Sequence, residues 1–277
     1  KIRQCGGATY CLDIIYEGKD TLCIHNPATG RESFMPHLLN KKETGLKKIT
    51  IVGAGPAGLE AARVCSEQGH SVTVFEASDK PGGQINLITR SKRRKDMAGI
   101  IDWRINICET NKVKFHFNSF ASKEEILSEN PDIIIIATGG VPNTDILSEG
   151  SDLVISTWDI LSGNVNIEDD VVLYDDGGNY PGLQAAEMIS SVTSKLEIVT
   201  PERFFSPDIG GMNFVPYGKN FYEKNVKISL NSRVKSVFRK GNRLGVKISS
   251  DYSDLTFEKE TSQVIVEHGT SPVDDLY

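Results

Sequence analysis

The feature that most constrains the fold is the stretch KKITIVGAGPAGLEAARVCSEQGHSVTVFEA, residues 47–77, in which closely spaced glycines separate two apolar runs. The run ITIV before Gly53 is continuous and rich in β-branched residues, which indicates a strand buried on both faces. The segment PAGLEAARVCSEQG that follows has apolar residues at helical spacing and ends at Gly69, a stop signal. With SVTVF as a second strand, the stretch predicts a βαβ unit with a glycine-rich turn.

The turn of this unit has the spacing G-x-G-x-x-G, and an acidic residue follows at the end of the second strand. Gly53 permits the tight turn, Gly55 lets the backbone approach a pyrophosphate, and Gly58 lets helix and strand pack closely. Unpaired N–H groups at the helix N-terminus face phosphate oxygens, and Glu76 can accept hydrogen bonds from ribose hydroxyls. We therefore expect dinucleotide or ADP binding, with a merely structural βαβ unit as the alternative. The predicted contact residues of this stretch are Gly53, Ala54, Gly55, Pro56, Ala57, Gly58, Glu76 and Ala77.

Two later segments carry further candidate contacts. ASDKPGGQ places Gly82 and Gly83 where the chain can pass close to a ligand, with Gln84 as a polar contact. PDIIIIATGG predicts a buried strand that ends at Thr138 and Gly139, beside the nucleotide. These residues resemble the two-dinucleotide-binding-domain flavoproteins, whose FAD domain carries E-x-x-x-x-x-G-G and A-T-G at these places. The resemblance favours FAD or ADP over NAD at this site.

A second βαβ pattern begins at Val171, with VVLY, the turn DDGGNYPG, the helical LQAAEMISSV and the strand LEIVT. Asp175 and Asp176 occupy this turn, where carboxylates oppose phosphate binding. Two interpretations of this unit follow: it is a structural remnant that no longer binds a nucleotide, or it is a specialised nicotinamide site. Arg203, just past the second strand, is either a contact for a 2′-phosphate or an ordinary surface arginine.

The segments VKISL, RVKSVF, LGVKISS and QVIVEHG predict short strands, and Gly241-Asn242 is a hairpin signal. Three antiparallel strands after a βαβ unit suit the nested nicotinamide-type domain of the same flavoprotein architecture. VIVEHGTSP suits the return crossing to the first domain. The sequence stops at Tyr277, before the Gly-Asp segment that contacts the flavin in that architecture, so we expect an incomplete isoalloxazine pocket.

Composition argues against several classes of partner. The chain has 277 residues and a formal net charge of −6, which offers no basic face for nucleic acid. No apolar run approaches the ~20 residues of a bilayer span and no signal peptide is visible, so we expect a cytoplasmic protein with no membrane partner. Lys1 is not a natural start, and we expect a fragment or a processed chain.

Three of the five cysteines, Cys5, Cys11 and Cys23, lie close together with the spacing C-x5-C-x11-C. Several soft ligands at short range are what an iron–sulfur centre or a zinc site requires. Cys65 and Cys108 lie at helical positions and are expected to be small core residues.

The segment CLDIIYEGKDTLCIHNPATGRE closely resembles the iron–sulfur linker of the trimethylamine dehydrogenase and 2,4-dienoyl-CoA reductase family. IVGAGPAGLEAARV and GGQ follow it in the family's order, and the resemblance covers essentially the whole chain. It implies a [4Fe–4S] loop, then an FAD- or ADP-binding domain with a nested second domain. It also implies a preceding barrel that carries FMN and binds the small-molecule substrate, so no catalytic residue is assigned to this chain.

One departure from that family concerns the first cysteines. The family has C-x-x-C, whereas this sequence has Ala8 three residues after Cys5, and alanine cannot ligate iron. Three alternatives follow: a three-cysteine iron–sulfur site, an empty loop, or zinc. His25, two residues past Cys23, is the nearest substitute for a fourth ligand.

Other polar features carry weaker expectations. The basic run RSKRRK, residues 90–95, is expected to be a solvated loop, with docking to the barrel or to an acidic electron acceptor as the alternative. The histidines expected to be surface or packed residues without a partner are His37, His70, His116 and His268.

Together these observations predict an α/β fold of the two-dinucleotide-binding-domain, Rossmann-like type. The predicted segments are an iron–sulfur-type cysteine segment and linker over 1–46, an FAD/ADP-type dinucleotide-binding domain over 47–145, a nested NAD(P)-like domain with a β-meander over 146–262, and a truncated return over 263–277.

The predicted function is the nucleotide-binding and electron-transfer portion of an iron–sulfur flavoprotein oxidoreductase, of the NADH:flavin oxidoreductase or amine dehydrogenase type. An ADP-binding structural module without redox chemistry of its own is the alternative. FAD or ADP, an iron–sulfur cluster, FMN in the barrel and NAD(P)H are the expected cofactors, and the expected partners are the barrel, an electron-transfer protein and further copies in a homo-oligomer.

Overall fold

The computed structural model describes residues 2–277 and divides the chain into two compact units. Unit 1 comprises Lys1–Gly140 and Pro272–Tyr277, and unit 2 comprises Val141–Ser271. Where the chain passes from unit 1 to unit 2 and back, strands β5 (Gly140–Pro142) and β14 (Thr270–Pro272) form a two-stranded sheet. Within the described residues, no helix combines the length and the apolar character needed to cross a bilayer.

Unit 1 is built on a parallel sheet with the strand order β3-β2-β1-β4. Its strands are β1 (Lys48–Val52), β2 (Ser71–Phe75), β3 (Lys114–His116) and β4 (Ile133–Ile136). Its helices are α1 (Tyr10–Tyr16), α2 (Pro56–Glu67), α3 (Ile85–Ile88), the 3₁₀ helix η1 (Lys95–Ala98), α4 (Gly99–Thr110) and α5 (Lys123–Ser128).

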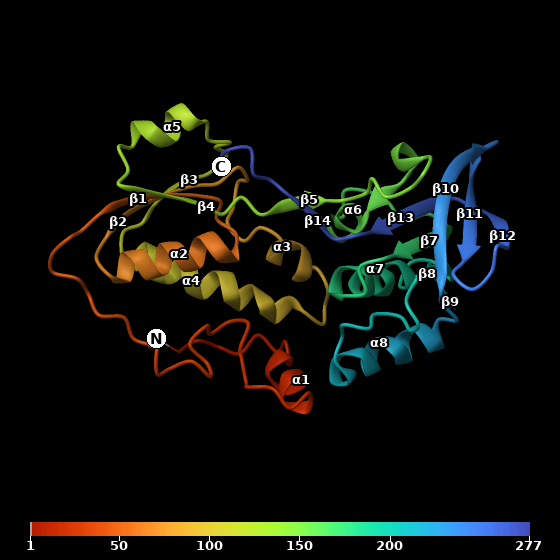
Figure 1. Ribbon diagram of the computed structural model, residues 1–277, viewed down its shortest axis with the longest axis horizontal. Helices are drawn as coiled ribbons and strands as arrows, with labels where there is room; N and C mark the ends of the chain where they lie inside the picture. Colours follow the sequence, from red (N-terminus) through yellow and green to blue (C-terminus); the bar gives the residue numbers. More distant parts are fainter. Residues whose placement is uncertain (1) are drawn as a thin grey trace. The chain divides into compact units, whose positions relative to one another are not determined.

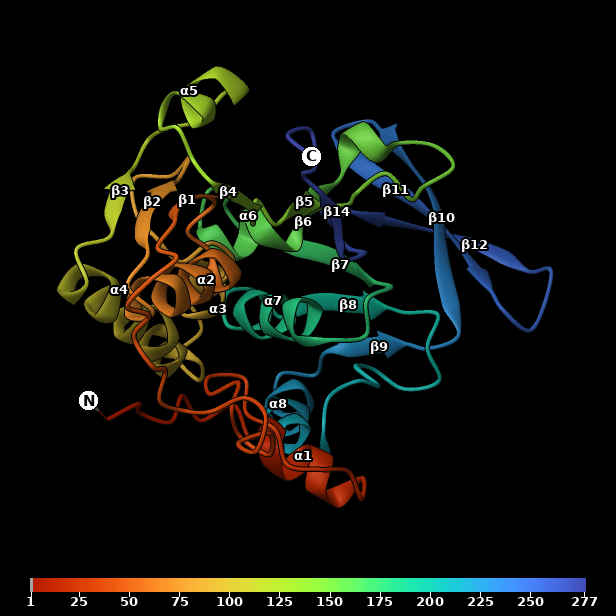
Figure 2. The same cartoon turned by 60° about the vertical axis from the view of Figure 1, so that its left-hand side comes forward.

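The faces of this sheet are covered by different helices. Ile51 and Val74 belong to a core cluster with Leu59 of α2 and Ile101 of α4, and these two helices lie side by side across that face (Figures 1 and 2). On the opposite face, Ile126 of α5 packs with neighbouring strand residues. Because β1 and β2 are parallel, their carboxyl ends lie at the same edge of the sheet, where α2 begins soon after β1.

Unit 2 has a second parallel sheet with the strand order β6-β13-β7-β8-β9. Its strands are β6 (Ile155–Ser156), β7 (Asp170–Asp175), β8 (Lys195–Val199), β9 (Lys227–Ser229) and β13 (Gln263–Glu267), and an antiparallel meander is formed by β10 (Ser232–Lys240), β11 (Arg243–Ser250) and β12 (Thr256–Thr261). Its helices are the 3₁₀ helix η2 (Ser151–Leu153), α6 (Thr157–Ser162), α7 (Tyr180–Ser190) and α8 (Gly211–Glu223).

The two faces of the second sheet also differ. Leu173 of β7 and Ile265 of β13 pack with helix residues such as Leu183 of α7. On the other face, Tyr174 of β7 packs with residues of the meander such as Val246. Neighbouring residues of β7 therefore face different environments, which becomes important where the strand ends at Asp175.

The strand predictions for unit 2 need two corrections. The meander contains β12, which was not predicted as a strand because its sequence TFEKET is charged and mostly exposed. VKISL, predicted as a short strand before the meander, forms β9 of the parallel sheet, and QVIVE, predicted as the return crossing to the first domain, forms β13 of the same sheet. The predicted hairpin is confirmed, since Lys240 pairs with Arg243 across Gly241-Asn242.

The domain boundaries also differ from the predicted ones. The chain enters unit 2 at Val141, not at residue 146. The return to unit 1 comes at Pro272 and not at residue 263, because β13 pairs with both β6 and β7 and so completes the sheet of unit 2.

Candidate nucleotide-binding site

The turn between β1 and α2 is shaped by its glycines. A Cβ atom at Gly58 would lie 1.9 Å from the carbonyl oxygen of Gly53, so only glycine allows α2 to start this close to the strand. Gly53 has a φ of 102°, and a Cβ there would lie 2.3 Å from the carbonyl oxygen of Ala137. A Cβ at Gly55, in contrast, would meet no heavy atom of the described residues within 4 Å. Gly53 and Gly58 are therefore required by packing, whereas Gly55 borders open space.

Glu76 lies at the carboxyl end of β2 with its side chain directed at this turn. Its Oε2 accepts a hydrogen bond from the Ala54 amide at 2.6 Å, and its Oε1 accepts one from the Ser78 amide at 2.8 Å. The side chain is largely buried, at 8% exposure. Because each carboxylate oxygen can accept more than one hydrogen bond, Glu76 keeps capacity for the hydroxyls of a ribose.

The loop after β2 closes on the same turn. The Gly82 amide donates to the Ala54 carbonyl oxygen at 2.9 Å, and a Cβ at Gly83 would lie 3.2 Å from the Cα of Gly55. Gly82 and Gly83 have φ values of 127° and 51°, which favour glycine. The structure therefore brings the turn, Glu76 and this loop together around the space beside Gly55.

The remaining predicted contacts lie around this centre. Gln84 is exposed at the start of α3, directly after the glycine loop. Thr138 follows the Ala137 carbonyl that contacts Gly53, but its hydroxyl donates to the Val273 carbonyl oxygen and so fixes the returning chain. Gly139, with a φ of 71°, borders open space among the described residues.

The corresponding turn of unit 2, between β7 and α7, is filled by a side chain. Asp175 is fully buried, and its Oδ1 accepts hydrogen bonds from the amides of Gly177 and Gly178, each at 3.1 Å. A Cβ at Gly182 would lie 2.6 Å from the carboxyl carbon of Asp175. Glycine is thus needed at this helix start because of a carboxyl group.

A second buried carboxyl group lies beside Asp175. Glu267, at the end of β13, pairs in register with Asp175, accepts a hydrogen bond from the Thr157 hydroxyl and another from the Gly269 amide at 3.0 Å. Burial, with the nearby charge of Glu267 as a smaller cause, raises the pKa of Asp175 to about 7. Burial also raises the pKa of Glu267.

Asp176 belongs to the opposite face of the sheet. Its Oδ2 lies 2.7 Å from Nδ1 of His268, and its Oδ1 lies 3.7 Å from Nη1 of Arg233. His268 therefore has a partner that its spacing in the sequence did not indicate. Arg203, the candidate contact for a 2′-phosphate, is exposed.

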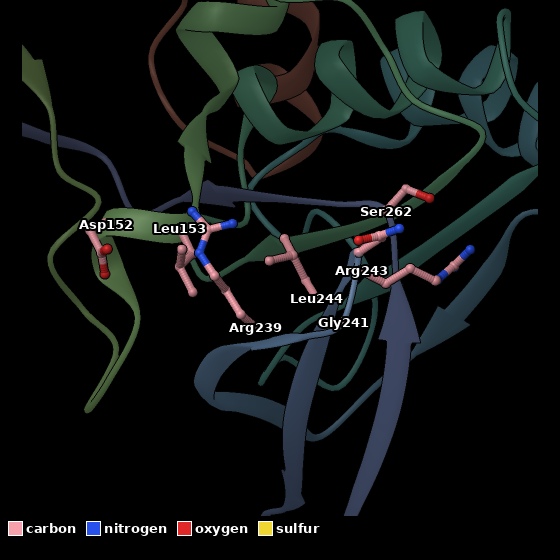
Figure 3. Close-up of a pocket in the computed structure, with 8 residues that line it drawn as sticks. Asp152, Leu153, Arg239, Gly241, Arg243, Leu244 and Ser262 are labelled. Carbon is pink, nitrogen blue, oxygen red and sulfur yellow. The ribbon is translucent and has the colours of Figure 1, made fainter.

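Unit 2 also has an open hollow of about 470 Å³ beside the hairpin of the meander (Figure 3). Arg239 and Arg243 contribute its positive charge, but Arg243 is paired with Asp170 at 2.5 Å. The hollow contains no residue of either glycine turn, and we assign it no role in nucleotide binding.

The cysteine segment lies on the outer side of α2 and α4 in unit 1. Sγ of Cys23 accepts hydrogen bonds from the amides of His25 and Asn26, each at 3.4 Å, and Sγ of Cys5 accepts one from the Gly7 amide at 3.4 Å. Over residues 2–277, however, no three His, Cys, Asp or Glu side chains form a group that could hold a metal. As placed, the residues do not fit a cluster, and Cys5, Cys11 and Cys23 stay predicted ligands.

His25, the suggested substitute ligand, faces the helices of unit 1. Its ring is buried, its Nδ1 lies 2.9 Å from the Gln4 carbonyl oxygen, and it meets the Trp103 ring edge-on with centroids 5.8 Å apart. The Gln4 carbonyl can only accept, so Nδ1 carries the proton and Nε2 has a bare lone pair. In the described part of the chain this Nε2 has no hydrogen-bond partner. Burial lowers the pKa of His25, which keeps the ring neutral.

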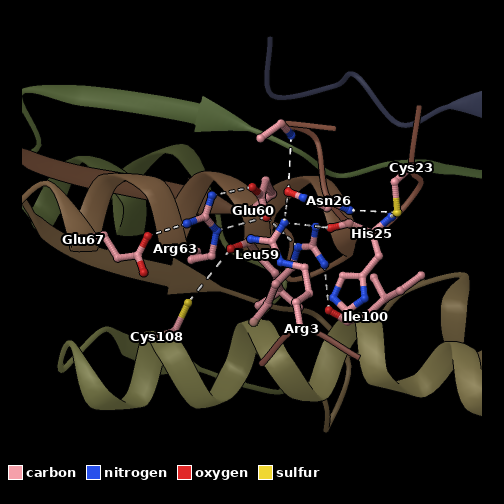
Figure 4. Close-up of polar contacts among 12 residues, drawn as sticks. Arg3, Cys23, His25, Asn26, Leu59, Glu60, Arg63, Glu67, Ile100 and Cys108 are labelled. Atoms are coloured by element: carbon pink, nitrogen blue, oxygen red, sulfur yellow. Dashed lines mark hydrogen bonds and ion pairs between the residues drawn. The ribbon is translucent and has the colours of Figure 1, made fainter. Parts of the chain in front are cut away.

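An unpredicted cluster of charged residues holds the cysteine segment on unit 1 (Figure 4). Arg104 of α4 lies 2.7 Å from Oε2 of Glu60 and donates to the His25 carbonyl oxygen at 3.1 Å. Arg3 donates to Oδ1 of Asn26 at 2.5 Å, and its guanidinium carbon lies 3.8 Å from the centroid of Trp103. The cluster therefore links residues near the start of the chain to both helices.

Ion pairs balance most of the buried charge in this cluster. Arg63 pairs with Glu60 at 2.6 Å and with Glu67 on the same helix. Burial would raise the pKa of Glu60, but the hydrogen bonds from Arg63 and the charge of Arg104 outweigh it and hold the pKa below its usual range. Removing one partner would leave a buried charge uncompensated.

Two other sequence-based expectations concern unit 1. Cys108 is buried and Cys65 is half-buried in the core cluster of α2 and α4, as predicted. Burial raises the pKa of Cys108 to about 12, which makes this thiol unreactive. The basic run 90–95 is not a solvated loop throughout, because Arg94 is only 6% exposed.

Comparisons with known proteins agree with this geometry. Residues 47–277 match the family model described as pyridine nucleotide-disulphide oxidoreductase. A probable N-methylproline demethylase of Rhizobium meliloti is 48% identical over 276 residues, covering 100% of this chain and 41% of that protein. An N,N-dimethylglycine/sarcosine dehydrogenase of Chromohalobacter salexigens is 38% identical over 285 residues, again covering 100% of this chain and 41% of the relative.

A solved structure of 2-naphthoyl-CoA reductase with 2-naphthoyl-CoA matches with a TM-score of 0.87 and 29% identity, over 98% of this chain and 40% of that one. The chain thus spans about two fifths of the length of these relatives. The resemblance drawn from the cysteine segment and the glycine turns is confirmed, and the portion matched is the nucleotide-binding one. The chain belongs to the pyridine nucleotide-disulphide oxidoreductase family, as the nucleotide-binding portion found in trimethylamine dehydrogenase and 2,4-dienoyl-CoA reductase relatives.

Proposed function

We propose that this chain is the nucleotide-binding and electron-transfer portion of a larger flavoprotein oxidoreductase, and that its turn in unit 1 binds FAD or ADP. The observation that carries the proposal is the open space beside Gly55, bordered by the glycine loop and by Glu76. The free amides at the start of α2 suit a diphosphate, and the carboxylate of Glu76 suits the adjoining ribose. Family membership supports flavin and pyridine nucleotide binding in general, and the choice of FAD or ADP at this turn is our proposal.

The substrate of the whole protein is proposed from the relatives. Two of them are named for N-methylated amino acids, N-methylproline and N,N-dimethylglycine or sarcosine. We therefore propose that the full-length protein oxidises an N-methylated amino acid in the part that precedes this chain. A flavin there would take up the electrons, and the role of the described residues is to bind and orient the nucleotide. The alternative, an ADP-binding module without redox chemistry, is not favoured by a family of oxidoreductases.

An iron–sulfur cluster on Cys5, Cys11 and Cys23 is part of the proposal only through the family resemblance. Iron and acid-labile sulfide analysis of the full-length protein tests it. About four irons and four sulfides per chain are expected for the [4Fe–4S] type. Absence of both would remove the cluster and leave the nucleotide site unaffected.

Nucleotide identity is tested by extraction from the full-length protein, with a visible absorption spectrum of the extract. Chromatographic separation of the extract distinguishes FAD from ADP, and it separates both from the FMN expected in the barrel, which has a flavin band of its own. Absence of any adenine nucleotide, together with no ADP binding in calorimetry, would contradict the proposal.

The location is tested with a matched pair of variants, Gly55→Ala and Gly99→Ala. In both, the new Cβ meets no heavy atom of the described residues within 4 Å, so both should fold. Gly55→Ala places a methyl group where the backbone must approach the diphosphate, and we expect ADP affinity to fall about tenfold or more. Gly99→Ala, at the start of α4, should bind ADP as the unmodified chain does. Equal affinities of the two variants would place the site elsewhere.

A further inference from the structure

The turn between β7 and α7 in unit 2 has the place of a phosphate-binding turn, but two of its amides already donate to a side chain. In such turns the backbone N–H groups point at phosphate oxygens. Here the amides of Gly177 and Gly178 both donate to Oδ1 of Asp175, at 3.1 Å. The carboxylate makes the hydrogen bonds that a phosphate oxygen would otherwise make.

The space required by a phosphate is also taken. Asp175 is fully buried, and a Cβ at Gly182 would lie 2.6–2.8 Å from its carboxyl atoms. A Cβ at Gly177 would lie 3.2 Å from Cγ of Glu267, so the second carboxyl group packs over the same turn. Two carboxyl groups thus pack against the glycines of the turn that a diphosphate would have to approach.

Oδ2 of Asp175 shows that this arrangement is not a fully satisfied polar network. It is buried and has no hydrogen-bond partner among residues 2–277. An unpartnered buried oxygen costs free energy and is unusual unless the group has a further role. Burial of this carboxyl group also raises the pKa of Asp175.

From these contacts we propose that the Asp175 carboxylate is a built-in substitute for a phosphate, which closes the nicotinamide-type turn of unit 2 to NAD⁺. The family is described by its pyridine nucleotides. On this proposal unit 2 keeps the βαβ backbone of a nucleotide-binding turn, and the Asp175 side chain occupies the turn. Asp175 is then the residue that determines whether unit 2 accepts a dinucleotide. This inference is independent of what unit 1 binds.

The test compares NAD⁺ binding to the 277-residue chain and to two variants, Asp175→Gly and Asp176→Gly. Calorimetry gives the number of sites, and hydrogen exchange with mass spectrometry shows whether NAD⁺ protects residues 175–182. Asp176 carries the same charge one residue further on, but it pairs with His268 on the opposite face. Its variant therefore controls for loss of charge and for added glycine in the turn.

The expected result is one additional NAD⁺ site in Asp175→Gly, at least tenfold tighter than any binding to this turn in the unmodified chain or in Asp176→Gly. Protection of residues 175–182 should appear only in Asp175→Gly. Because the readout is a difference between variants, it stands whether or not unit 1 binds a nucleotide.

Two results would overturn the proposal. One is protection of residues 175–182 by NAD⁺ in the unmodified chain, which can be measured even if a variant fails to fold. The other is a folded Asp175→Gly, checked by circular dichroism, that gains no site. Asp175→Ala serves as a second variant without the carboxyl group, and it should gain the same site.

Discussion

The turns that follow β1 and β7 have the same place in their units, between a buried parallel strand and the helix that packs on it. They differ in what lies at the tip: Gly55 borders open space in unit 1, whereas Asp175 fills the turn in unit 2. Each helix start needs a glycine, but Gly58 is required by a backbone carbonyl and Gly182 by a carboxyl side chain. A shared backbone therefore does not determine ligand binding, which depends on which atoms occupy the turn.

The largest effect is expected from Gly58→Ala. The new methyl group would lie 1.9 Å from the Gly53 carbonyl oxygen, and a backbone atom cannot move away without displacing α2 from β1. We expect a loss of about 3 kcal/mol or more in the free energy of unfolding, measured by chemical denaturation. A loss below about 1 kcal/mol would show that the helix start is not as tightly packed as described.

The next effect concerns the buried charge in unit 2 and is tested with Asp175→Asn. The pKa of Asp175 is raised from 3.8 to about 7, chiefly by burial, so the folded chain holds this proton more tightly than the unfolded chain. The unmodified chain should therefore lose stability as the pH rises from about 4 to about 7, whereas the variant lacks this loss. From about pH 5 to about pH 8, we expect the free energy of unfolding of the variant to rise by on the order of 2 kcal/mol relative to that of the unmodified chain.

The measurement is chemical denaturation of both chains at the two pH values. Glu267 also has a raised pKa, but it is present in both chains, so the difference isolates Asp175 to first order. Parallel pH profiles for the two chains would show that Asp175 keeps an ordinary pKa.

A smaller effect tests whether Gly182 is required by the carboxyl group. Gly182→Ala alone brings a methyl group within 2.6 Å of the Asp175 carboxyl carbon. In the Asp175→Gly background the carboxyl carbon is absent, so Gly182→Ala should lower the free energy of unfolding by less. A double-mutant cycle of unfolding free energies should give a coupling of about 1 kcal/mol. Additive costs would mean that Gly182 is required by something else.

The smallest effect is expected from Asp176→Asn. Its partners His268 and Arg233 are both more than a third exposed, so solvent screens these ion pairs. We expect a change below about 1 kcal/mol in thermal or chemical unfolding, with no new nucleotide site. A larger loss of unfolding free energy would show that the different effects of Asp175 and Asp176 are not explained by their different burial.

Much of the fold follows from local sequence patterns. The strand, glycine turn and helix around Gly53 are encoded within one short stretch, and the hairpin at Gly241 has a two-residue signal. The strand β12 was missed because TFEKET has a charged, exposed pattern, and only its pairing with β11 makes it a strand.

The parts of the candidate site that the sequence did not reveal depend on contacts between distant residues. Asp175 meets Glu267 only through the register of β7 with β13. Arg3 meets Trp103 because the start of the chain folds onto α4. Spacing within one segment cannot indicate such contacts, although the charged residues of α2 at positions 60, 63 and 67 were a visible signal of a polar helix face.

The most direct test of the account is hydrogen exchange of the 277-residue chain with and without saturating ADP. The open turn of unit 1 and the filled turn of unit 2 predict protection of residues 53–58 and 76–84, and unchanged exchange over residues 175–182. Protection of residues 175–182 without protection of residues 53–58 would contradict the account.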